Sequence, residues 1–322
     1  MDVAGLVKGA SRGEGLGNKF LGTARECDCL CHVLRAFEDA GGEGGAGESI
    51  IHVEGRVDPV EDAEVVNLEL ILADLAHVER RLERLSAAGA PGSEEERGAL
   101  ESVKTVLQRG EPARTVGLSA DAARAIKSLS LLTLKPVLYA FNVDEVDFTL
   151  DRDAAAARCG SLFGKIRHKG EDDAFVIVSA KLEEHLGACE GPEEREAFAV
   201  RELGMEPGEL DFLPLSSYAL PSKVARDLLG LSIAHTGPGV PPEKSQTTRA
   251  HLFRSHPPLT AAGLAGRIHG DIERGFLRAE VAQAADLLRH GSYADARAAG
   301  VCRSEGRDAE LQNGDVALIK WK

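Results

Sequence analysis

The sequence lacks the features of a membrane protein and of a small secreted domain. It has no run of about 18 apolar residues, which is the length that a membrane-spanning helix needs. Met1 is followed directly by Asp2, without the apolar segment of a signal peptide. The 6 cysteines are few for 322 residues and do not form the framework of a disulfide-rich domain. We therefore expect a cytoplasmic protein that does not bind membranes.

Positive charge is also in short supply. The chain has 38 Lys and Arg against 52 Asp and Glu, which gives a formal net charge of −14. This balance argues against indiscriminate binding of nucleic acid or membranes through the whole surface, although it is compatible with a local basic patch. Apolar residues make up 43% of the chain, enough to bury large cores in two or three domains.

Glycine is abundant in residues 2–18. This stretch begins with Asp2-x-x-Gly5 and has more backbone freedom than a regular helix or strand uses. In P-loop nucleotide hydrolases, an Asp that ends a strand steadies Mg²⁺, and the Gly three residues later donates its N–H to the γ-phosphate. The alternative is a Gly-rich surface loop, and these residues alone support both interpretations equally.

Three cysteines precede and enter a predicted strand at residues 30–37. Cys27, Cys29 and Cys31 stand at every second position, so on a strand they would share one face. A metal site, a redox site and thiol regulation are hypotheses for such a group. No second pair of Cys or His stands at zinc spacing, so buried thiols that pack under a helix are the favoured interpretation.

A helical hairpin is predicted between residues 62 and 107. Apolar residues recur at spacings of three and four over residues 62–85, which is typical of an amphipathic helix with a narrow apolar seam. Residues 87–93 break this pattern, and Leu100, Val103 and Leu107 begin a returning helix. The seam would hold the two helices together, and the hairpin has a shape suited to partner contact.

Two buried strands are predicted at residues 135–141 and 175–178, and polar residues follow each of them. In open α/β sheets, ligands bind outside the carboxyl ends of the strands. These polar clusters therefore predict a base-recognition pocket. Its candidate residues are Asn142, Val143, Glu145, Ser179, Ala180 and Lys181.

Three short motifs together point to one family. Asp2-x-x-Gly5, Asn142-x-x-Glu145 and Ser179-Ala180-Lys181 resemble the third, fourth and fifth motifs of a translation-factor-type nucleotide hydrolase. The surrounding sequence resembles the Obg-like ATPase (YchF) family, and the match runs in order along nearly the whole chain. The segments that carry it include residues 4–11, 37–39, 52–55, 57–59 and 69–75.

The resemblance implies an α/β fold with a P-loop NTPase-type parallel sheet, incomplete in this chain, an inserted helical hairpin and a C-terminal β-grasp (TGS) domain. Residues 1–64 and 131–231 would form the partial nucleotide-binding domain. Residues 65–130 would form the helical insertion, and residues 232–322 the TGS domain.

The resemblance also implies hydrolysis of ATP in preference to GTP, with Mg²⁺ as the metal ion. Asp2 would hold Mg²⁺, and Gly5 would sense the γ-phosphate. Glu145 stands where the Asp of an Asn-Lys-x-Asp motif accepts hydrogen bonds from guanine, and Val143 stands where the Lys stacks on the base. We therefore expect weak selectivity for guanine.

Further roles follow from the same resemblance. Asn142 would brace the base pocket, and residues 179–181 would flank the base. Leu6 occupies the position at which Ras-like enzymes carry a water-orienting Gln, and Leu cannot orient water. His52 is the candidate to act in its place in hydrolysis.

The C-terminal part resembles the TGS domain, a module linked to contact with RNA and the ribosome. Asn313-Gly314 precedes the alternating residues 316–321 and predicts a hairpin turn. Residues 234–290 carry more Lys and Arg than Asp and Glu, together with half of the 10 His. We expect the face that binds a phosphate backbone here, and a solvated surface of mixed charge is the alternative.

The family's phosphate-binding loop, Gly-x-x-x-x-Gly-Lys-Ser/Thr, occurs nowhere in the 322 residues. Residues 160–166 contain a Gly-Lys pair but lack the spacing and the Ser or Thr. We therefore expect an N-terminally truncated chain with impaired nucleotide binding and an incomplete sheet. The competing hypothesis is a catalytically dead remnant that binds RNA or the ribosome without nucleotide.

Overall fold

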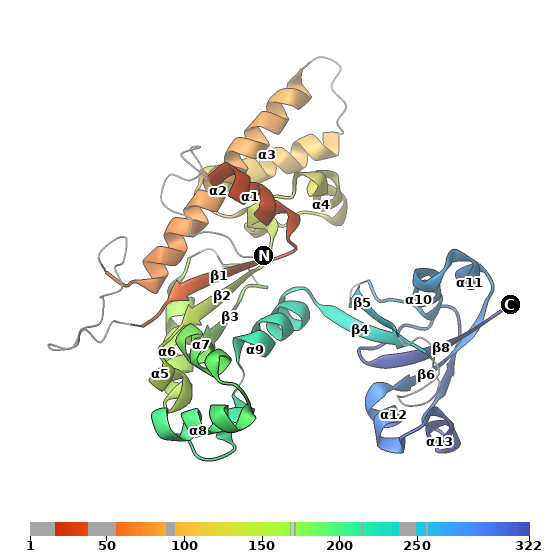
Figure 1. The fold of residues 1–322 in the computed structure, drawn as a ribbon. Helices are drawn as coiled ribbons and strands as arrows, with labels where there is room; N and C mark the ends of the chain where they lie inside the picture. The colour runs from red at the N-terminus through yellow and green to blue at the C-terminus, as the bar shows by residue number, and fades with distance from the viewer. Residues whose placement is uncertain are drawn as a thin grey trace. The chain divides into compact units, whose positions relative to one another are not determined.

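The computed structural model describes residues 17–37, 56–87, 94–167, 169–170, 172–213, 215–237, 249–255 and 257–322. It divides the chain into two units, Met1–Val224 and Ala225–Lys322 (Figure 1). Four residues with a predicted role, Asp2, Gly5, Leu6 and His52, lie outside the described residues. No helix in the described ranges is long and apolar enough to cross a membrane.

A three-stranded parallel sheet forms the centre of the first unit. Its strands are β1 (Leu30–Arg35), β2 (Val137–Asn142) and β3 (Ala174–Val178), in the order β1-β2-β3. The central strand β2 is apolar at successive positions because both faces of a central parallel strand are covered. Leu138, Tyr139, Ala140 and Phe141 are fully buried. The parallel sheet and its strand positions are thereby confirmed.

Helices connect and cover these strands. A βαβ connection through α5 and α6 joins β2 to β3, and Phe163 of α6 packs against Phe175 of β3 with ring centroids 5.2 Å apart. Leu182 and Leu186 of α7 join the same core. The bounds are α5 Glu145–Thr149, α6 Arg152–Lys165, α7 Ala180–Ala188, α8 Pro192–Glu202 and α9 Ser216–Lys223.

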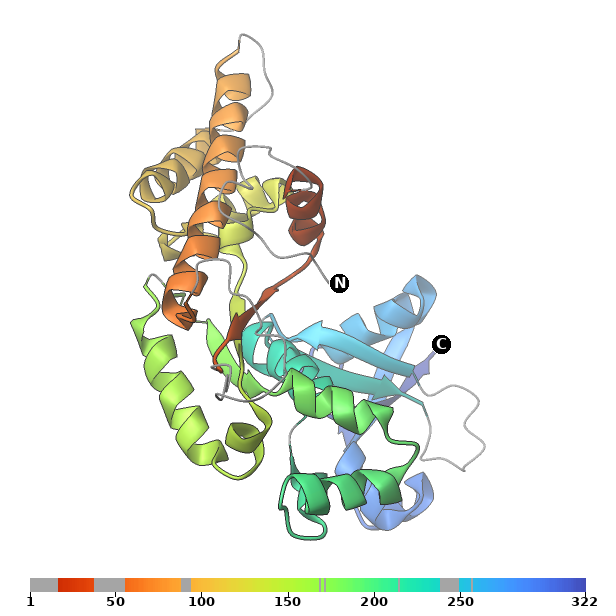
Figure 2. The same cartoon turned by 60° about the vertical axis from the view of Figure 1, so that its left-hand side comes forward.

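The predicted helical hairpin is present as α2 (Pro59–Ser86) and α3 (Glu94–Gln108). Asp58 caps the first turn of α2 by accepting the N–H groups of Val60 and Glu61, each at 3.1 Å, and Pro59 suits the first helical position. The buried seam includes Val78, Leu100 and Val103. Figure 2 shows α2 and α3 projecting from the sheet, with the first turns of α2 beside α6. Short elements, η2 Ala113–Thr115, α4 Ala120–Ile126, η3 Lys127–Leu129 and η4 Leu132–Leu134, lead from the hairpin to β2.

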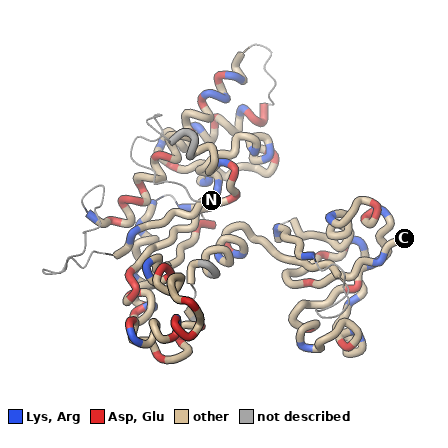
Figure 3. The backbone as a smooth tube through the Cα atoms, viewed as in Figure 1, with Lys and Arg blue, Asp and Glu red and all other residues tan. Residues whose placement is uncertain are grey.

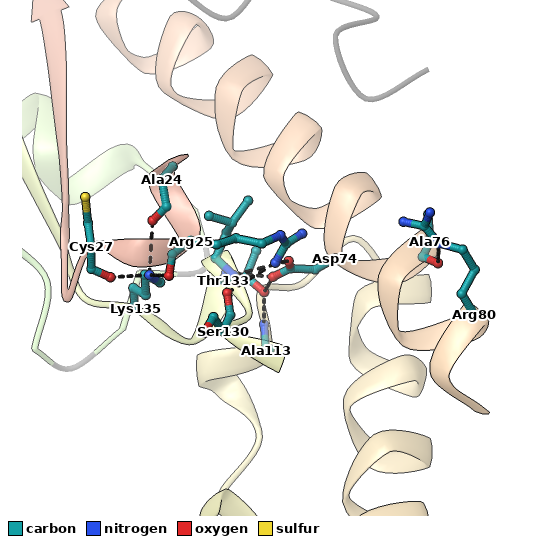
Figure 4. A network of polar contacts seen from close by, with 11 residues as sticks. Ala24, Arg25, Cys27, Asp74, Ala76, Arg80, Ala113, Ser130, Thr133 and Lys135 are labelled. Carbon is teal, nitrogen blue, oxygen red and sulfur yellow. Dashed lines mark hydrogen bonds and ion pairs between the residues drawn. The ribbon is translucent and has the colours of Figure 1, made fainter. Parts of the chain in front are cut away.

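A buried carboxylate joins the hairpin to the rest of the first unit (Figure 4). Asp74 of α2 has no exposed surface, and its Oδ2 accepts the backbone N–H and the hydroxyl of Thr133, both at 2.8 Å. Its Oδ1 accepts the N–H of Leu132 at 3.2 Å and pairs with Arg25 at 2.7 Å. Arg25 belongs to α1 (Gly17–Glu26), so one carboxylate ties together three separate segments of the chain.

A second polar contact fixes the end of α1. Lys135, just before β2, is only 9% exposed and donates to the backbone carbonyls of Ala24, Arg25 and Cys27. These carbonyls lie at the carboxyl end of α1, where helix carbonyls lack partners within the helix and the helix dipole is negative. Burial lowers the pKa of Lys135. The lysine therefore acts as a cap that holds α1 against the start of β2.

The cysteine prediction is wrong in its geometry. Cys27 and Cys29 lie in the bend between α1 and β1, and only Cys31 lies on the strand. Cys31 is exposed, so it is not a buried thiol packed under a helix. Within the described residues, no three His, Cys, Asp or Glu side chains are grouped to hold a metal ion.

The second unit contains a five-stranded sheet in the order β5-β4-β8-β6-β7. Its core is formed by alternate residues of the strands and by α10, and includes Ala234, Phe253, Leu264, Ala279 and Val281. The π-helical turn Val224–Leu228 leads into it. The bounds are β4 Leu231–Thr236, β5 Arg249–Arg254, α10 Ala261–Ile268, α11 Gly270–Arg274, β6 Phe276–Gln283, α12 Ala284–His290, α13 Tyr293–Ala298, β7 Arg303–Glu305 and β8 Asp315–Trp321.

The predicted hairpin at Asn313-Gly314 is wrong. Gly314 has a φ of +84° and lies in a tight turn, as its sequence indicates. The strand that follows, β8, pairs in parallel with β4 and antiparallel with β6, whereas the preceding strand β7 pairs with β6. The turn therefore leads into β8 but does not join β8 to the strand before it. The pairing of β8 is set by β4 and β6, which are distant in the sequence.

We predict that Asp74→Ala lowers the free energy of unfolding of the first unit by about 3–5 kcal/mol. The substitution leaves Arg25 and two backbone N–H groups without their acceptor in a buried place. Urea denaturation followed by circular dichroism measures the change. Glu79→Ala is the matched control on the same helix, because Glu79 forms a partly exposed pair with Lys104 and its loss costs less than about 1 kcal/mol. Equal effects of the two substitutions would contradict the role of Asp74.

Candidate functional site

The carboxyl ends of β2 and β3 lie side by side and bring together the residues that the sequence singles out. Asn142 is the last residue of β2 and is paired with Val178, the last residue of β3. The side chain of Asn142 reaches across this edge, where its Oδ1 accepts the backbone N–H of Ala180 at 2.9 Å. Ala180 is the first residue of α7, so Asn142 ties the start of this helix to the central strand.

Glu145 is held by two basic side chains of α7. Its Oε2 lies 2.8 Å from Nζ of Lys181, and its Oε1 lies 2.7 Å from Nδ1 of His185. The Glu145 side chain is 14% exposed, whereas that of Lys181 is 67% exposed. The hydrogen bond to Glu145 raises the pKa of Lys181. Each carboxylate oxygen of Glu145 therefore has a partner within the protein.

Ser179 and Val143 face inward at this edge. The Ser179 side chain has no exposed surface and caps α7 by accepting the N–H of Leu182 at 3.5 Å. Val143 is 2% exposed and belongs to the core, while its N–H donates to the carbonyl of Val178 at 2.9 Å. A contact between Val143 and a bound base would therefore involve the backbone, since its side chain cannot stack on the base.

The described part of the site comprises the base-recognition half of the predicted constellation. Its exposed rim includes Lys181 and His185 on α7. The residues expected to act on phosphate, metal and water, Asp2, Gly5, Leu6 and His52, lie outside the described residues.

His185 was not singled out in the sequence. It stands four residues after Lys181, so on a helix the two side chains share one face and can both reach Glu145. Its ring also packs edge-on against Phe198 of α8, with centroids 5.4 Å apart. The helical spacing from Lys181 is the signal that could have found it.

Known proteins resemble this chain both in its C-terminal part and over nearly its whole length. Residues 245–322 match a family model named YchF-GTPase_C and described as a protein of unknown function (DUF933). Over 326 residues the chain is 40% identical to "Ribosome-binding ATPase YchF" of Bacillus subtilis, with 99% of this chain and 80% of that protein covered. "Obg-like ATPase 1" of Caenorhabditis elegans is 30% identical over 324 residues, which cover 99% of this chain and 74% of the relative.

A solved structure extends this likeness to three dimensions. The "Schizosaccharomyces pombe YchF GTPase" superposes with a TM-score of 0.72 at 29% identity and covers 98% of this chain and 78% of its own. A parallel sheet with polar residues at the carboxyl ends of neighbouring strands is the framework of α/β nucleotide hydrolases. With the identities above, the family is established: the chain belongs to the YchF family of Obg-like nucleotide hydrolases.

Proposed function

We propose that this chain binds purine nucleotides at the carboxyl ends of β2 and β3, with ATP preferred over GTP, and acts as a ribosome-associated switch. The observation that carries the proposal is the engagement of Glu145 by Lys181 and His185. Guanine recognition uses a carboxylate that accepts hydrogen bonds from the base, and here Lys181 and His185 hold the carboxylate of Glu145 and compete for its acceptor positions. This supports weak selectivity for guanine.

Asn142 supplies the remaining base contact in this proposal. Its Oδ1 is engaged by the N–H of Ala180, which leaves the amide Nδ2 as a donor toward a ring nitrogen of the purine. Ala180 and Lys181 would flank the base, and Ser179 would act indirectly by capping α7. A donor toward a ring nitrogen is compatible with adenine and guanine alike, so the preference for ATP rests on the engaged Glu145.

The phosphate side is proposed from the sequence. Asp2 would hold Mg²⁺ and Gly5 would donate its N–H to the γ-phosphate, in the manner of an Asp-x-x-Gly motif. Mg²⁺ would neutralise charge that develops on the phosphate oxygens. Hydrolysis would transfer the γ-phosphoryl group to water, with ADP as the leaving group, and His52 is the proposed residue to orient that water in place of Leu6.

The buried network of Asp74 supports a switch that reaches the hairpin. The Asp-x-x-Gly segment precedes α1 in the chain, and Arg25 of α1 forms an ion pair with Asp74 of α2. A shift of α1 in response to nucleotide would disturb this pair and with it the seat of α2. Packed interfaces such as that between α1 and α2 change between discrete arrangements. We therefore propose that the hairpin changes position when nucleotide binds.

The ribosome is the proposed partner, in line with the names of relatives such as "Ribosome-binding ATPase YchF". A basic stretch of the second unit supports contact with ribosomal RNA. Arg249 lies on the edge strand β5, and Arg267 reaches from α10 to the carbonyl of Leu252 on that strand. Burial and then the neighbouring charges of Arg267 and Arg249 lower the pKa of His251 on the same strand.

The negative charge around α7 and α8 disfavours binding of RNA near the proposed base site. Figure 3 shows Asp and Glu gathered around α7 and α8, and α8 begins with acidic residues in its first turn. Because acidic residues surround the base site, the hairpin and β5 are the proposed surfaces for contact with the ribosome.

A ribosomal partner implies a cytoplasmic location for the chain.

The alternative function is binding of the ribosome or its RNA without nucleotide, through the basic stretch that includes Arg249 and Arg267.

Calorimetric titration with nucleotide and Mg²⁺ separates these functions. We predict that ATP binds with a Kd below about 1 mM and at least about tenfold more tightly than GTP. Asn142→Ala should weaken ATP binding about tenfold, since it removes one hydrogen-bonding group. Ser102→Ala on the exposed face of α3 is the control and should change nothing. Equal affinity for GTP would contradict the preference, and no heat with ATP would favour the function without nucleotide.

Pelleting with ribosomes tests the partner. We predict that the double substitution Arg249→Glu and Arg267→Glu lowers the ribosome-bound fraction severalfold and flattens the dependence of binding on salt, because phosphate contacts release counterions. Arg289→Glu on α12 is the control in the same unit, since Arg289 is exposed and pairs with Asp286. Equal pelleting of all variants would exclude β5 as the contact surface.

A further inference from the structure

A cavity of about 390 Å³ lies at the amino edge of the three-stranded sheet, away from the strand ends that carry the proposed base site. Thr133 precedes β2 in the chain and Arg167 precedes β3, and both line the cavity. Because these strands are parallel, the cavity lies at the edge where both begin. The other walls are the first turns of α2 and the loop that follows α3. The remaining lining residues are Glu61, Glu64, Val65, Asn67, Leu68, Leu70, Ile71, Arg109, Gly110, Pro112 and Arg114.

Positive charge exceeds negative charge in this cavity. Arg109, Arg114 and Arg167 line it, against Glu61 and Glu64. Glu64 is matched by Arg167, whose Nε donates to Oε1 at 2.9 Å. From outside the lining, Arg56 pairs with Glu61 and Asp173 pairs with Arg114, so the surplus positive charge is that of Arg109. Arg109 is exposed and pairs with no carboxylate of the described chain, so its charge is left for a ligand.

Arg114 is fixed in position before any ligand arrives. Its side chain is 10% exposed, pairs with Asp173 at 3.1 Å and donates to the carbonyl of Thr133 at 3.4 Å. Gly170 packs against it so closely that an added Cβ would come within 2.8 Å of Cδ. Its Nε–H is buried and has no hydrogen-bond partner within the described chain, and its five N–H donors outnumber the two acceptors, Asp173 and Thr133. A guanidinium held rigidly loses little conformational entropy when it binds an anion.

The rest of the lining is amphipathic. Asn67 and Thr133 add polar groups, while Val65, Leu68 and Ile71 of α2 offer an apolar wall. The volume is at the lower end of that of small-molecule sites, which combine a mostly apolar lining with a few fixed polar groups. Arginine suits phosphate because its planar group can donate two hydrogen bonds to one phosphate.

We propose that this cavity is a second ligand site, which binds a small phosphate monoester with an apolar body. The phosphate lies against Arg109 and Arg114, and the apolar body lies against α2. The occupant contacts Thr133, whose hydroxyl and N–H also hold Asp74, so it bears directly on the joint between the hairpin and the sheet. The inference does not depend on the proposed nucleotide site.

The test is calorimetric titration of the full chain with phenyl phosphate, in the presence and absence of ATP. We expect a Kd of about 1 mM or tighter, and Arg109→Glu should weaken it more than about tenfold. Arg109 is exposed and unpaired, so this variant should fold, which its melting temperature verifies. Arg124→Glu is the matched control, an exposed arginine of α4 outside the lining, and should leave binding unchanged.

Two further arms identify the site and the ligand class. Asn142→Ala should leave phenyl phosphate binding to the nucleotide-free chain unchanged, and saturating ATP should not displace phenyl phosphate, because Asn142 and the proposed base site lie at the opposite edge of the sheet. Benzoate should bind at least about tenfold more weakly, since a carboxylate carries less charge and fewer acceptor oxygens than a phosphate. Absence of binding at millimolar phenyl phosphate, equal affinity for benzoate, or loss of binding in Asn142→Ala but not in Arg109→Glu would overturn the proposal.

Discussion

The first unit depends on one buried carboxylate, that of Asp74. A charge without exposed surface is costly unless it is paired and hydrogen-bonded, and Asp74 meets this condition with Arg25, Leu132 and Thr133. Arg25 belongs to α1, and Leu132 and Thr133 belong to the segment before β2. The bonds to Asp74 therefore fix the position of the hairpin relative to both of these segments. The helical seam holds α2 to α3, but Asp74 decides where that pair sits on the sheet.

The same network connects the places where ligands are proposed to act. On one side is α1, which follows the Gly-rich segment and whose carboxyl end is capped by Lys135. On the other side is Thr133, which lines the cavity at the amino edge of the sheet. A nucleotide at the strand ends and a phosphate monoester in the cavity would therefore act on one joint from different directions. Any coupling between the two ligands would run through this contiguous set of packed elements, and substitution of either partner of the Arg25–Asp74 pair tests it.

Most of the correct predictions came from patterns among residues that are close together in the sequence. The seam of α2 and α3 follows from helical spacing, and the buried strand β2 follows from a continuous apolar run that ends at Asn142. The convergence of Asn142 with Ala180 follows from the rule that parallel strands end at one edge. The engagement of Glu145 by Lys181 was within reach, because it joins two motifs already singled out.

What could not be predicted depends on pairings that sequence spacing does not encode. Cys27 and Cys29 alternate with Cys31, but β1 begins only at Leu30, where the chain first pairs with β2. Asn313-Gly314 has the composition of a hairpin turn, yet β8 takes its partners from β4 and β6. The partners of Asp74 lie 49 to 59 residues away, and the arginines of the cavity come from two separate segments.

The central claim is that the purine lies at the carboxyl ends of β2 and β3. Photolabelling with 8-azido-ATP and Mg²⁺, followed by peptide mapping, tests this claim directly because the azide reacts with whatever lies beside the base. The account predicts label in the peptides that contain Asn142 to Glu145 or Ser179 to His185, and loss of that label when unmodified ATP is added in excess. Label confined to the first turns of α2 or to the second unit would contradict it.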